Sequence, residues 1–502
     1  MLTHLPVLPI IVPLMAAPLC VLVRQRKLAL GISLAVCWGT FALTVMLLME
    51  VLSHGVQSYS LGGWAAPWGI AYHVDMLSAF VMVFVAGIGA TVLTFAPLSI
   101  EKEIPTSLHY LFYTEYLLCL TGLLGIVITG DVFNLFVFLE ISSLSAYSLI
   151  SLGQSRQALT ASFQYLVMGT IGATFILIGI GLLYMMTGTL NMADMAVHLQ
   201  GSIKIGEETK IVMETRTILV AFAFLSVGIS LKMALFPLHM WLPNAYTFAP
   251  SVVTAFIAAT ATKVSVYVLL RFVFTIFGAD FAFTKMPLDT GLMVLSLVGI
   301  VAASTAAIFQ TNVKRLLAYS SIAQVGYMVL GISFASVSGL TGGIVHMFNH
   351  ALIKGGLFLA MGCLVFRLGS TQLTDLRGVG RRMPVTMFAW VVGGLGLIGV
   401  PLTAGFVSKW YLISAALERG WWPVALLVLF SSLLALIYVW RVVEVAYFEE
   451  PPEGAETVQE APLLMLVPTC CLIGATIVFG VWTEWSVDFA RQAASLLLGG
   501  GL

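Results

Sequence analysis

The chain is a succession of long apolar runs separated by short polar segments. A helix that crosses a lipid bilayer needs about 20 predominantly apolar residues. By that measure the pattern predicts about fourteen membrane-spanning helices, which we number in chain order. Their approximate ranges are 5–23, 28–52, 74–98, 109–129, 131–152, 158–187, 217–247, 251–275, 287–309, 313–335, 338–367, 383–415, 421–447 and 462–485. The polar segments between them are too short for a separate soluble core, so we expect an all-α polytopic membrane protein.

Composition supports the same class of protein. Hydrophobic residues make up 60% of the 502 residues, the mean hydropathy is +1.03, and charged residues make up 9%, against about 25% in soluble domains. The 23 basic and 23 acidic residues balance, so no net field attracts nucleic acid. The six cysteines show no C-x-x-C spacing, which disfavours iron–sulfur and zinc sites. We therefore expect no nucleic-acid partner, no metal and no cofactor.

The orientation follows from the first loop. No lysine or arginine precedes the first apolar run, whereas Arg24, Arg26 and Lys27 follow it directly. The positive-inside rule then places the N-terminus outside and argues against a cleaved signal peptide. The later loops show the same bias with less contrast. We expect a multi-pass protein of the cell inner (cytoplasmic) membrane.

Two of the predicted helices are interrupted near the middle of the membrane. The seventh contains Pro237 and Pro243, and the twelfth contains Pro401 among several glycines. Proline removes a backbone hydrogen bond of the helix, and free backbone groups at this depth are tolerated only beside protein or water. Breaks near 237–243 and 396–405 therefore indicate an internal hydrated cavity.

The two breaks lie five spans apart, so the second unit enters the membrane from the opposite side. Helices 4–8 and 9–13 are predicted to form two inverted five-helix repeats, an architecture typical of transporters. The chain then divides into N-terminal helices 1–3 (1–108), a first repeat (109–275), a second inverted repeat (276–447), and a C-terminal loop with helix 14 (448–502).

Ionisable residues inside the spans are the strongest functional signal. Glu140, Lys232, Lys263, Lys354 and Lys409 all fall within predicted helices, where a central charge costs about 2.5–3.5 kcal/mol. A structural ion pair accounts for Glu140 and one lysine, and we predict that the lysine is Lys232. Burial favours the neutral amine and an approaching carboxylate favours the charged one. Each lysine is therefore suited to take up and release a proton.

Histidines extend this set. His346, His350 and Lys354 are spaced by four residues, and each such step advances about 6 Å and rotates only about 40° along a helix, so the three form one stripe. We expect them, with Lys263, to line one water-filled path. A structural histidine pair and a metal site remain alternatives, although a metal needs further ligands. His239 either links Lys232 to Lys263 through water or serves as a backbone partner.

The remaining polar residues have more modest expected roles. Asp75 and Asp131 precede helices and are expected to be N-caps. Ser320, Ser321 and Gln324 occupy the repeat-related place of Glu140 and are expected to order water. We predict that Lys409 is the terminal switch from which a proton leaves toward one surface. The alternative is that Lys409 extends its amine to the membrane interface.

Several motifs resemble those of the proton-translocating antiporter-like subunits shared by respiratory complex I, membrane-bound hydrogenases and Mrp cation/proton antiporters. The longest runs from Lys232 to Pro250, KMALFPLHMWLPNAYTFAP, and is followed by Lys263 and Arg271. The others are GDVFNLFVFLE at 130–140, KRLLAYSS at 314–321, HALIK at 350–354 and GFVSK at 405–409. The resemblance covers roughly residues 70–445.

The resemblance implies a hydrated polar axis along the membrane plane, and every expected position is filled here: Glu140, Lys232, Lys263, His346, His350, Lys354 and Lys409. One complex I subunit carries glutamate at the position of Lys409, which disfavours that paralogue, and the largest paralogues extend beyond helix 14, where this chain stops at Leu502. The resemblance therefore favours the D-type subunit of Mrp antiporters. A complex I or hydrogenase-type subunit is the alternative.

Either assignment implies a multi-subunit complex in the lipid bilayer with homologous antiporter-like subunits as partners. No ligands for flavin, haem or iron–sulfur clusters are evident in the sequence, so redox chemistry would lie in partner chains. Sodium prefers hard oxygen ligands, whereas the axis is mostly nitrogen. We therefore expect protons to move through this chain and sodium to be handled elsewhere in the complex.

Overall fold

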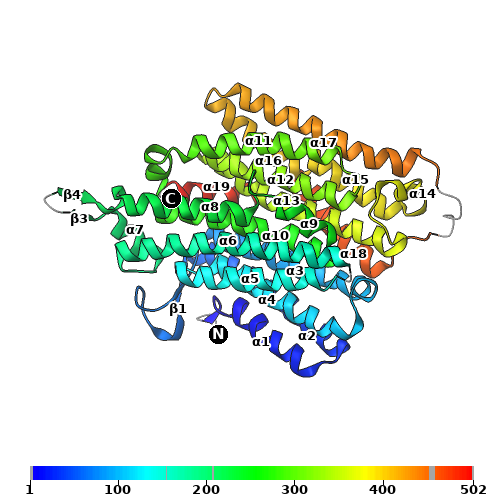
Figure 1. Ribbon diagram of the computed structural model, residues 1–502, viewed down its shortest axis with the longest axis horizontal. Helices are drawn as coiled ribbons and strands as arrows, with labels where there is room; N and C mark the ends of the chain where they lie inside the picture. The colour runs from blue at the N-terminus through cyan, green and yellow to red at the C-terminus, as the bar shows by residue number, and fades with distance from the viewer. Residues whose placement is uncertain (1–3, 154, 206–207, 452–457, 500–502) are drawn as a thin grey trace.

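The computed structural model describes residues 4–153, 155–205, 208–451 and 458–499. Figure 1 shows long helices lying side by side in one bundle, with their axes running roughly along the longest dimension of the molecule. Two β-hairpins and the C-terminus lie at one end of the bundle, which we call the hairpin end, and α14 lies at the opposite end.

The helices follow the predicted order. The first half contains α1 (Leu8–Val23), α2 (Arg26–His54), α3 (Met76–Glu103), α4 (His109–Ile128), α5 (Val132–Ser151), α6 (Arg156–Thr187), α7 (Met192–Gln200), α8 (Arg216–Met233), α9 (Trp241–Phe248) and α10 (Ser251–Leu270), which continues as the π-helix η5 (Arg271–Ile276). The second half contains α11 (Leu288–Ile308), α12 (Val313–Ser333), α13 (Val337–Leu368), α14 (Val379–Arg382), α15 (Pro384–Ile398), α16 (Ala404–Glu418), α17 (Trp422–Phe448), α18 (Leu463–Val481) and α19 (Glu484–Leu497).

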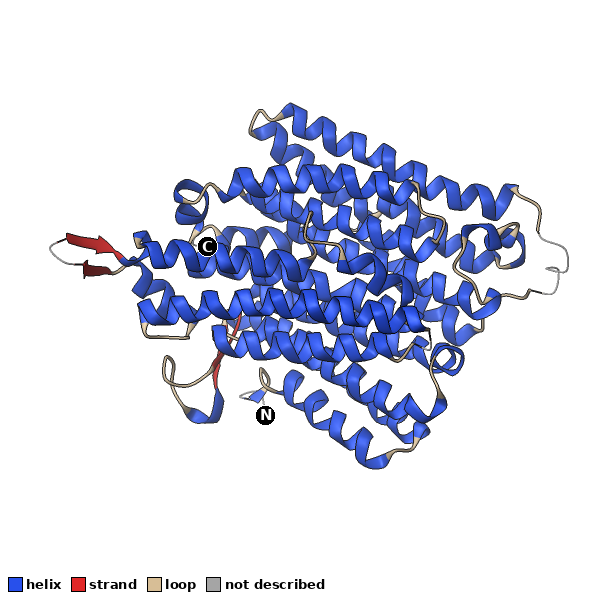
Figure 2. Cartoon of the chain, in the orientation of Figure 1, coloured by secondary structure: helices blue, strands red, loops and turns tan. Residues whose placement is uncertain are grey.

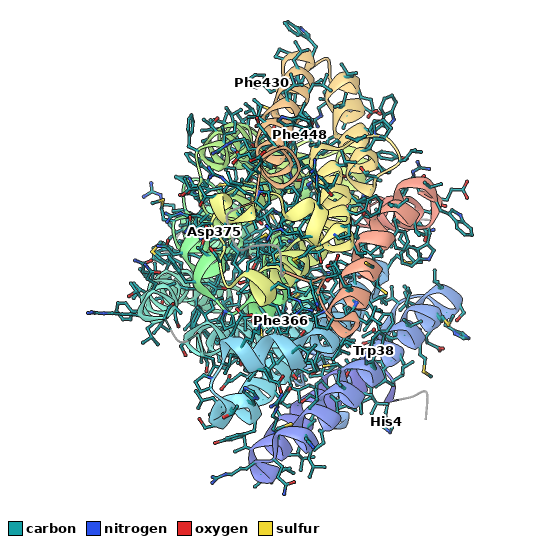
Figure 3. All side chains as sticks on the ribbon, turned by 90° about the vertical axis from the view of Figure 1, so that its right-hand side faces the viewer. His4, Trp38, Phe366, Asp375, Phe430 and Phe448 are labelled. Atoms are coloured by element: carbon teal, nitrogen blue, oxygen red, sulfur yellow. The ribbon has the colours of Figure 1, made fainter. Side chains whose placement is uncertain are left out.

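Among the described residues, 12 helices are long and apolar enough to cross a membrane, and α1 and α15 are shorter apolar helices. When α8 is joined to α9 and α15 to α16, these helices account for every predicted span. Large apolar side chains also cover the outside of the bundle, among them Trp38, Phe430 and Phe448 (Figure 3). The prediction of a polytopic helical membrane protein is confirmed.

Both predicted helix breaks are present. Helix α8 ends at Met233, Ala234 adopts a left-handed conformation with φ 59°, and α9 begins at Trp241. The first break therefore begins earlier than predicted and includes Pro237, whereas Pro243 lies in the first turn of α9, where proline is tolerated.

The second break separates α15 from α16 and begins with Gly399 at φ 85°. The two half-helices then pack against each other so closely that a Cβ on Gly405 would lie 1.9 Å from the carbonyl oxygen of Gly396. Only glycine fits at this contact, which explains part of the glycine enrichment of the twelfth predicted helix.

Within the described ranges, the structure adds to the predicted fold four strands and the helices α7, α14 and α19. Strands β1 (Gln57–Ser60) and β2 (Ala71–Val74) form one antiparallel hairpin, and β3 (Ser202–Ile205) and β4 (Glu208–Ile211) form another (Figure 2). Helices α7 and α19 lie in segments where no span was predicted. Helix α19 is amphipathic, since Val487, Phe489 and Ala490 are buried while Asp488 is exposed.

Helix α13 lies at the centre of the bundle, in contact with α3, α10, α12, α15, α16, α18 and α19. Its side chains are buried continuously from Gly339 to Leu364. Helices α10 and α12 are also buried along almost their whole lengths. The polar residues on these three helices therefore face protein and not lipid.

Candidate proton-transfer site

The first element of the site is an ion pair between α5 and α8. Lys232, in the last turn of α8 before the break, donates to Glu140 Oε1 at 3.3 Å and to Ser143 Oγ at 2.9 Å. The Lys232 side chain is 5% exposed and that of Glu140 is 26% exposed. The predicted contact between Glu140 and Lys232 is therefore confirmed. The Glu140 carboxylate lies near the surface of the bundle, whereas the Lys232 amine is buried.

A small cavity adjoins this pair. It has a volume of about 30 Å³ and is lined by Lys232, Ser143, Tyr165 and, from α10, Ser265, which exceeds the roughly 10–15 Å³ that one water molecule needs by this measure. The cavity thus lies between the ion pair and the helix that carries Lys263.

Lys263 is fully buried in the middle of α10. Its Nζ donates to the carbonyl oxygen of Ala258 at 2.5 Å and to Thr262 Oγ1 at 3.4 Å. The side chain lies within electrostatic range of His346, His350 and Lys354 on α13. The structure therefore brings α10 and the polar stripe of α13 together, as the sequence predicted.

The stripe itself is poorly satisfied by hydrogen bonds. The rings of His346 and His350 are parallel, with centroids 6.0 Å apart. His346 Nδ1 is 2.8 Å from Ser408 Oγ, but His346 Nε2 and both ring nitrogens of His350 have no hydrogen-bond partner within the described part of the chain. Buried polar groups in folded proteins are nearly always bonded. An arrangement that leaves three ring nitrogens free is better suited to exchanging protons with water than to holding helices together.

Lys354 completes the stripe and contacts α12. Its Nζ donates to Ser320 Oγ at 2.5 Å and to the carbonyl oxygen of Leu317 at 2.7 Å. Ser320 therefore provides a polar contact at the place where the first repeat carries Glu140. In the described ranges, no three His, Cys, Asp or Glu residues are grouped so that they could hold a metal ion.

Lys409 turns back toward the second break. It lies in α16, and its Nζ donates to the carbonyl oxygens of Leu397 at 3.1 Å and Ile398 at 2.8 Å and to Ser432 Oγ at 2.9 Å. These carbonyls form the C-terminal end of α15, where unpaired acceptors and the helix dipole favour a cation. The alternative that Lys409 extends to the membrane interface is wrong, because its amine is held inside the bundle.

His239 lies in the first break, where its ring stacks on Phe236 with centroids 5.2 Å apart. Its Nδ1 is buried without a partner among the described residues. No hydrogen bond in the described ranges joins His239 to Lys232 or Lys263, so a link through water stays a prediction.

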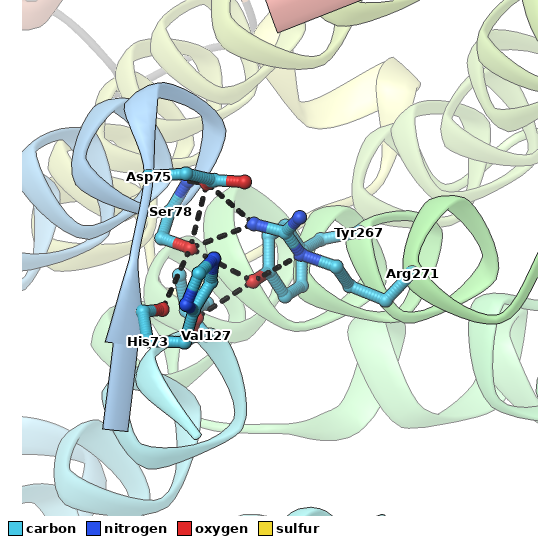
Figure 4. Close-up of polar contacts among 6 residues, drawn as sticks. All are labelled: His73, Asp75, Ser78, Val127, Tyr267 and Arg271. Atoms are coloured by element: carbon cyan, nitrogen blue, oxygen red, sulfur yellow. Dashed lines mark hydrogen bonds and ion pairs between the residues drawn. The ribbon is translucent and has the colours of Figure 1, made fainter. Parts of the chain in front are cut away.

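A polar cluster at the hairpin end was not predicted (Figure 4). Asp75 caps α3 by accepting from Ser78 N at 2.9 Å, as expected, but it also pairs with Arg271 Nη2 at 2.5 Å. Burial acts to raise the pKa of Asp75, and the adjacent Arg271 guanidinium outweighs it, so that the pKa is lowered. Arg271 Nε donates to the Tyr267 hydroxyl, which donates to the carbonyl oxygen of Val127. The cluster thereby joins α3, α4 and α10.

The opposite end of α10 is also closed by charged residues. Glu103 caps the helix by accepting from Ser251 N at 2.8 Å, and Lys314 donates to the carbonyl oxygen of Ala249 at 3.1 Å. Lys314 lies at the start of the tenth predicted helix, and its side chain is buried. Asp131 caps α5 by accepting from Asn134 N at 2.7 Å, as predicted.

Comparison with known proteins places this arrangement in a family. The family described as "NADH:quinone oxidoreductase/Mrp antiporter, TM" matches residues 129–435. The N subunit of NADH-quinone oxidoreductase from Desulforudis audaxviator is 40% identical, over 98% of this chain and 99% of that protein. The D subunit of the Na(+)/H(+) antiporter from Bacillus subtilis is 31% identical, over 98% of this chain and 97% of that protein.

A solved structure with the same fold supports this family assignment. A chain in the structure of the Mrp complex from Dietzia sp. DQ12-45-1b superposes with a TM-score of 0.89 at 25% identity, covering 99% of this chain and 97% of that one. The matched family region contains both helix breaks and every candidate proton-transfer residue from Glu140 to Lys409. The chain therefore belongs to the transmembrane family of NADH:quinone oxidoreductase and Mrp antiporter subunits.

Proposed function

We propose that this chain is the proton-translocating subunit of a multi-subunit Mrp-type monovalent cation (Na⁺)/H⁺ antiporter. One observation carries the proposal. Four lysines of the predicted axis, Lys232, Lys263, Lys354 and Lys409, are buried in the bundle, and in the part of the chain that the structure describes only Lys232 among them has a carboxylate within ion-pair distance. A buried ammonium without a counter-ion is unstable, so the other three are suited to bind a proton transiently. The residues assigned to transfer are Glu140, Lys232, His239, Lys263, His346, His350, Lys354 and Lys409.

The ion pair at the edge of the chain acts as the modulator. While Glu140 and Lys232 are in contact, each stabilises the charge of the other. When they separate, the amine loses that stabilisation and releases its proton toward Lys263, from which the α13 stripe leads to Lys409. The partly exposed carboxylate of Glu140 lies where another membrane subunit of the complex can approach it and draw it away from Lys232.

Sodium is assigned to other subunits, since the buried groups of the axis are mainly nitrogen donors and Na⁺ prefers oxygen cages. The chain is placed in the cytoplasmic membrane, with the N-terminus and the hairpin end outside. Support for this orientation comes from Arg24, Arg26 and Lys27, which follow the first helix.

A second candidate function has its own support. The 40% identity to the N subunit of NADH-quinone oxidoreductase exceeds the 31% identity to the D subunit of the Na(+)/H(+) antiporter. The same axis would then pump protons within a respiratory complex I or a membrane-bound hydrogenase-type complex. In that case the driving reaction is electron transfer in partner chains.

The source of driving force separates the two functions. The complex that contains this chain is purified from its native membrane and reconstituted into sealed vesicles with a pH-sensitive dye inside. An Mrp-type antiporter moves protons when a sodium gradient is applied without any electron donor. A respiratory subunit moves protons only when a donor and a quinone are supplied. The absence of proton movement under both conditions, in an intact complex, would refute both assignments.

A further inference from the structure

No hydrogen-bonded connection within the described residues joins Lys354 to Lys409, the last two lysines of the proposed transfer axis. Among the described residues, Lys354 on α13 and Lys409 on α16 share no hydrogen-bond partner, and each donates to one serine hydroxyl, Ser320 for Lys354 and Ser432 for Lys409. On the histidine side, the hydroxyl of Ser408 faces His346 and donates to a backbone carbonyl. These hydrogen bonds of His346 and Ser408 do not extend to the amine of Lys409.

Two buried tyrosines fill the interval between these lysines. Tyr327 on α12 lies next to Lys409, whose Nζ is 4.9 Å from the centre of its ring. The Tyr327 hydroxyl is hydrogen-bonded to Ser431 Oγ and also interacts with the neighbouring Ser432, both on α17. Tyr438 lies two turns further along α17 and is fully buried, and it is near enough to Ser320 and Tyr327 to interact with both.

If the Tyr438 side chain only filled space, its hydroxyl would lower the stability of the fold. It is close to Ser320 but makes no hydrogen bond of ordinary geometry within the described part of the chain, and leaving a buried hydroxyl unpaired costs about 1–3 kcal/mol. Phenylalanine would fill the same volume without that penalty. A buried phenol between two serine-bonded lysines is instead placed to exchange hydrogen bonds with its neighbours or with water.

We propose that Ser320, Tyr438, Tyr327 and Ser432 form a hydroxyl bridge that carries protons between Lys354 and Lys409, in parallel with the histidine stripe. This inference rests on the proposed function and deepens it. A charged Lys354 gives one proton to Ser320, each hydroxyl passes its own proton to the next oxygen as it receives one, and a neutral Lys409 gains one. One N–H bond breaks and one forms, no group is oxidised or reduced, and rotation of the hydroxyls restores the bridge.

Removal of single hydroxyls tests the bridge. Tyr438→Phe and His350→Ala are made separately and together, and proton uptake is measured in membrane vesicles that contain the whole complex. Because two parallel paths share the flux, each single variant is expected to keep about one third to one half of the wild-type rate, and the double variant to fall below about one tenth. Tyr113→Phe is the matched control, since Tyr113 is also fully buried with an unpartnered hydroxyl but lies on α4, and it is expected to transport normally.

Other outcomes overturn the bridge. If Tyr438→Phe transports at the wild-type rate and the double variant transports at the rate of His350→Ala alone, the hydroxyl carries no proton. If Tyr438→Phe alone is as inactive as the double variant, the two paths are not parallel. Should the double variant fail to assemble, Tyr327→Phe replaces Tyr438→Phe under the same criteria. Lys354→Ala separates this proposal from the broader one, because normal transport in that variant would refute the proton axis itself.

Discussion

Glu140→Gln removes the modulating charge and nearly preserves the shape of the side chain. The Lys232 amine lies 3.3 Å from the Glu140 carboxylate and is 5% exposed. At an effective dielectric constant of about 20, two unit charges at this separation attract each other by about 5 kcal/mol. Glu140 is 26% exposed, so water screens part of this energy, and we take about half as the realised value. A loss of about 2–3 kcal/mol lowers the proton affinity of Lys232 by about 100-fold.

The consequence is a lysine that holds its proton much less tightly during the transport cycle. Ser143 Oγ remains 2.9 Å from Nζ, but a hydroxyl does not replace the lost charge. We expect proton uptake by vesicles carrying the Glu140→Gln complex to fall to background, while the variant chain still assembles with its partners. Glu50→Gln is the matched control, because Glu50 is 27% exposed and pairs with His54 on α2, away from the axis. Wild-type uptake by the assembled Glu140→Gln complex would remove Glu140 from the mechanism.

Three further predictions concern other parts of the chain. Lys409→Arg is expected to impair proton uptake nearly as much as Lys409→Ala, because arginine does not release its proton; normal turnover with arginine would make Lys409 structural. Gly405→Ala should destabilise the complex by about 1–3 kcal/mol, since its Cβ would meet the carbonyl of Gly396, whereas Gly474→Ala has open space and should leave the melting temperature unchanged. Asp75→Asn leaves the buried Arg271 guanidinium without its carboxylate partner and should destabilise the complex by about 3–5 kcal/mol. Because the pKa of Asp75 is lowered, its contribution is present above the ordinary value near 4 and is lost only as pH falls through the lowered pKa, so this effect should be constant between pH 5 and 8; a strong pH dependence in unfolding measurements would contradict it.

The sequence by itself determined which segments cross the membrane, where two of them break, and which of them carry charge. Each of these properties is local. An apolar run of sufficient length is a span whatever its neighbours are, and a proline such as Pro237 interrupts its own helix. A lysine inside such a run is conspicuous because it is expensive there, which is why Lys263 and Lys409 were identified without any structure.

Only the tertiary structure decided what these side chains touch. Soluble helices reveal their buried face through an amphipathic pattern, but spans such as α10 and α12 are apolar on all sides, and membrane helices associate through small residues and polar contacts that leave a weak periodic signal. The rotation of each helix was therefore hidden. It sets the contacts of Arg271 with Asp75, of Lys409 with the carbonyl end of α15, and of Tyr438 with Ser320.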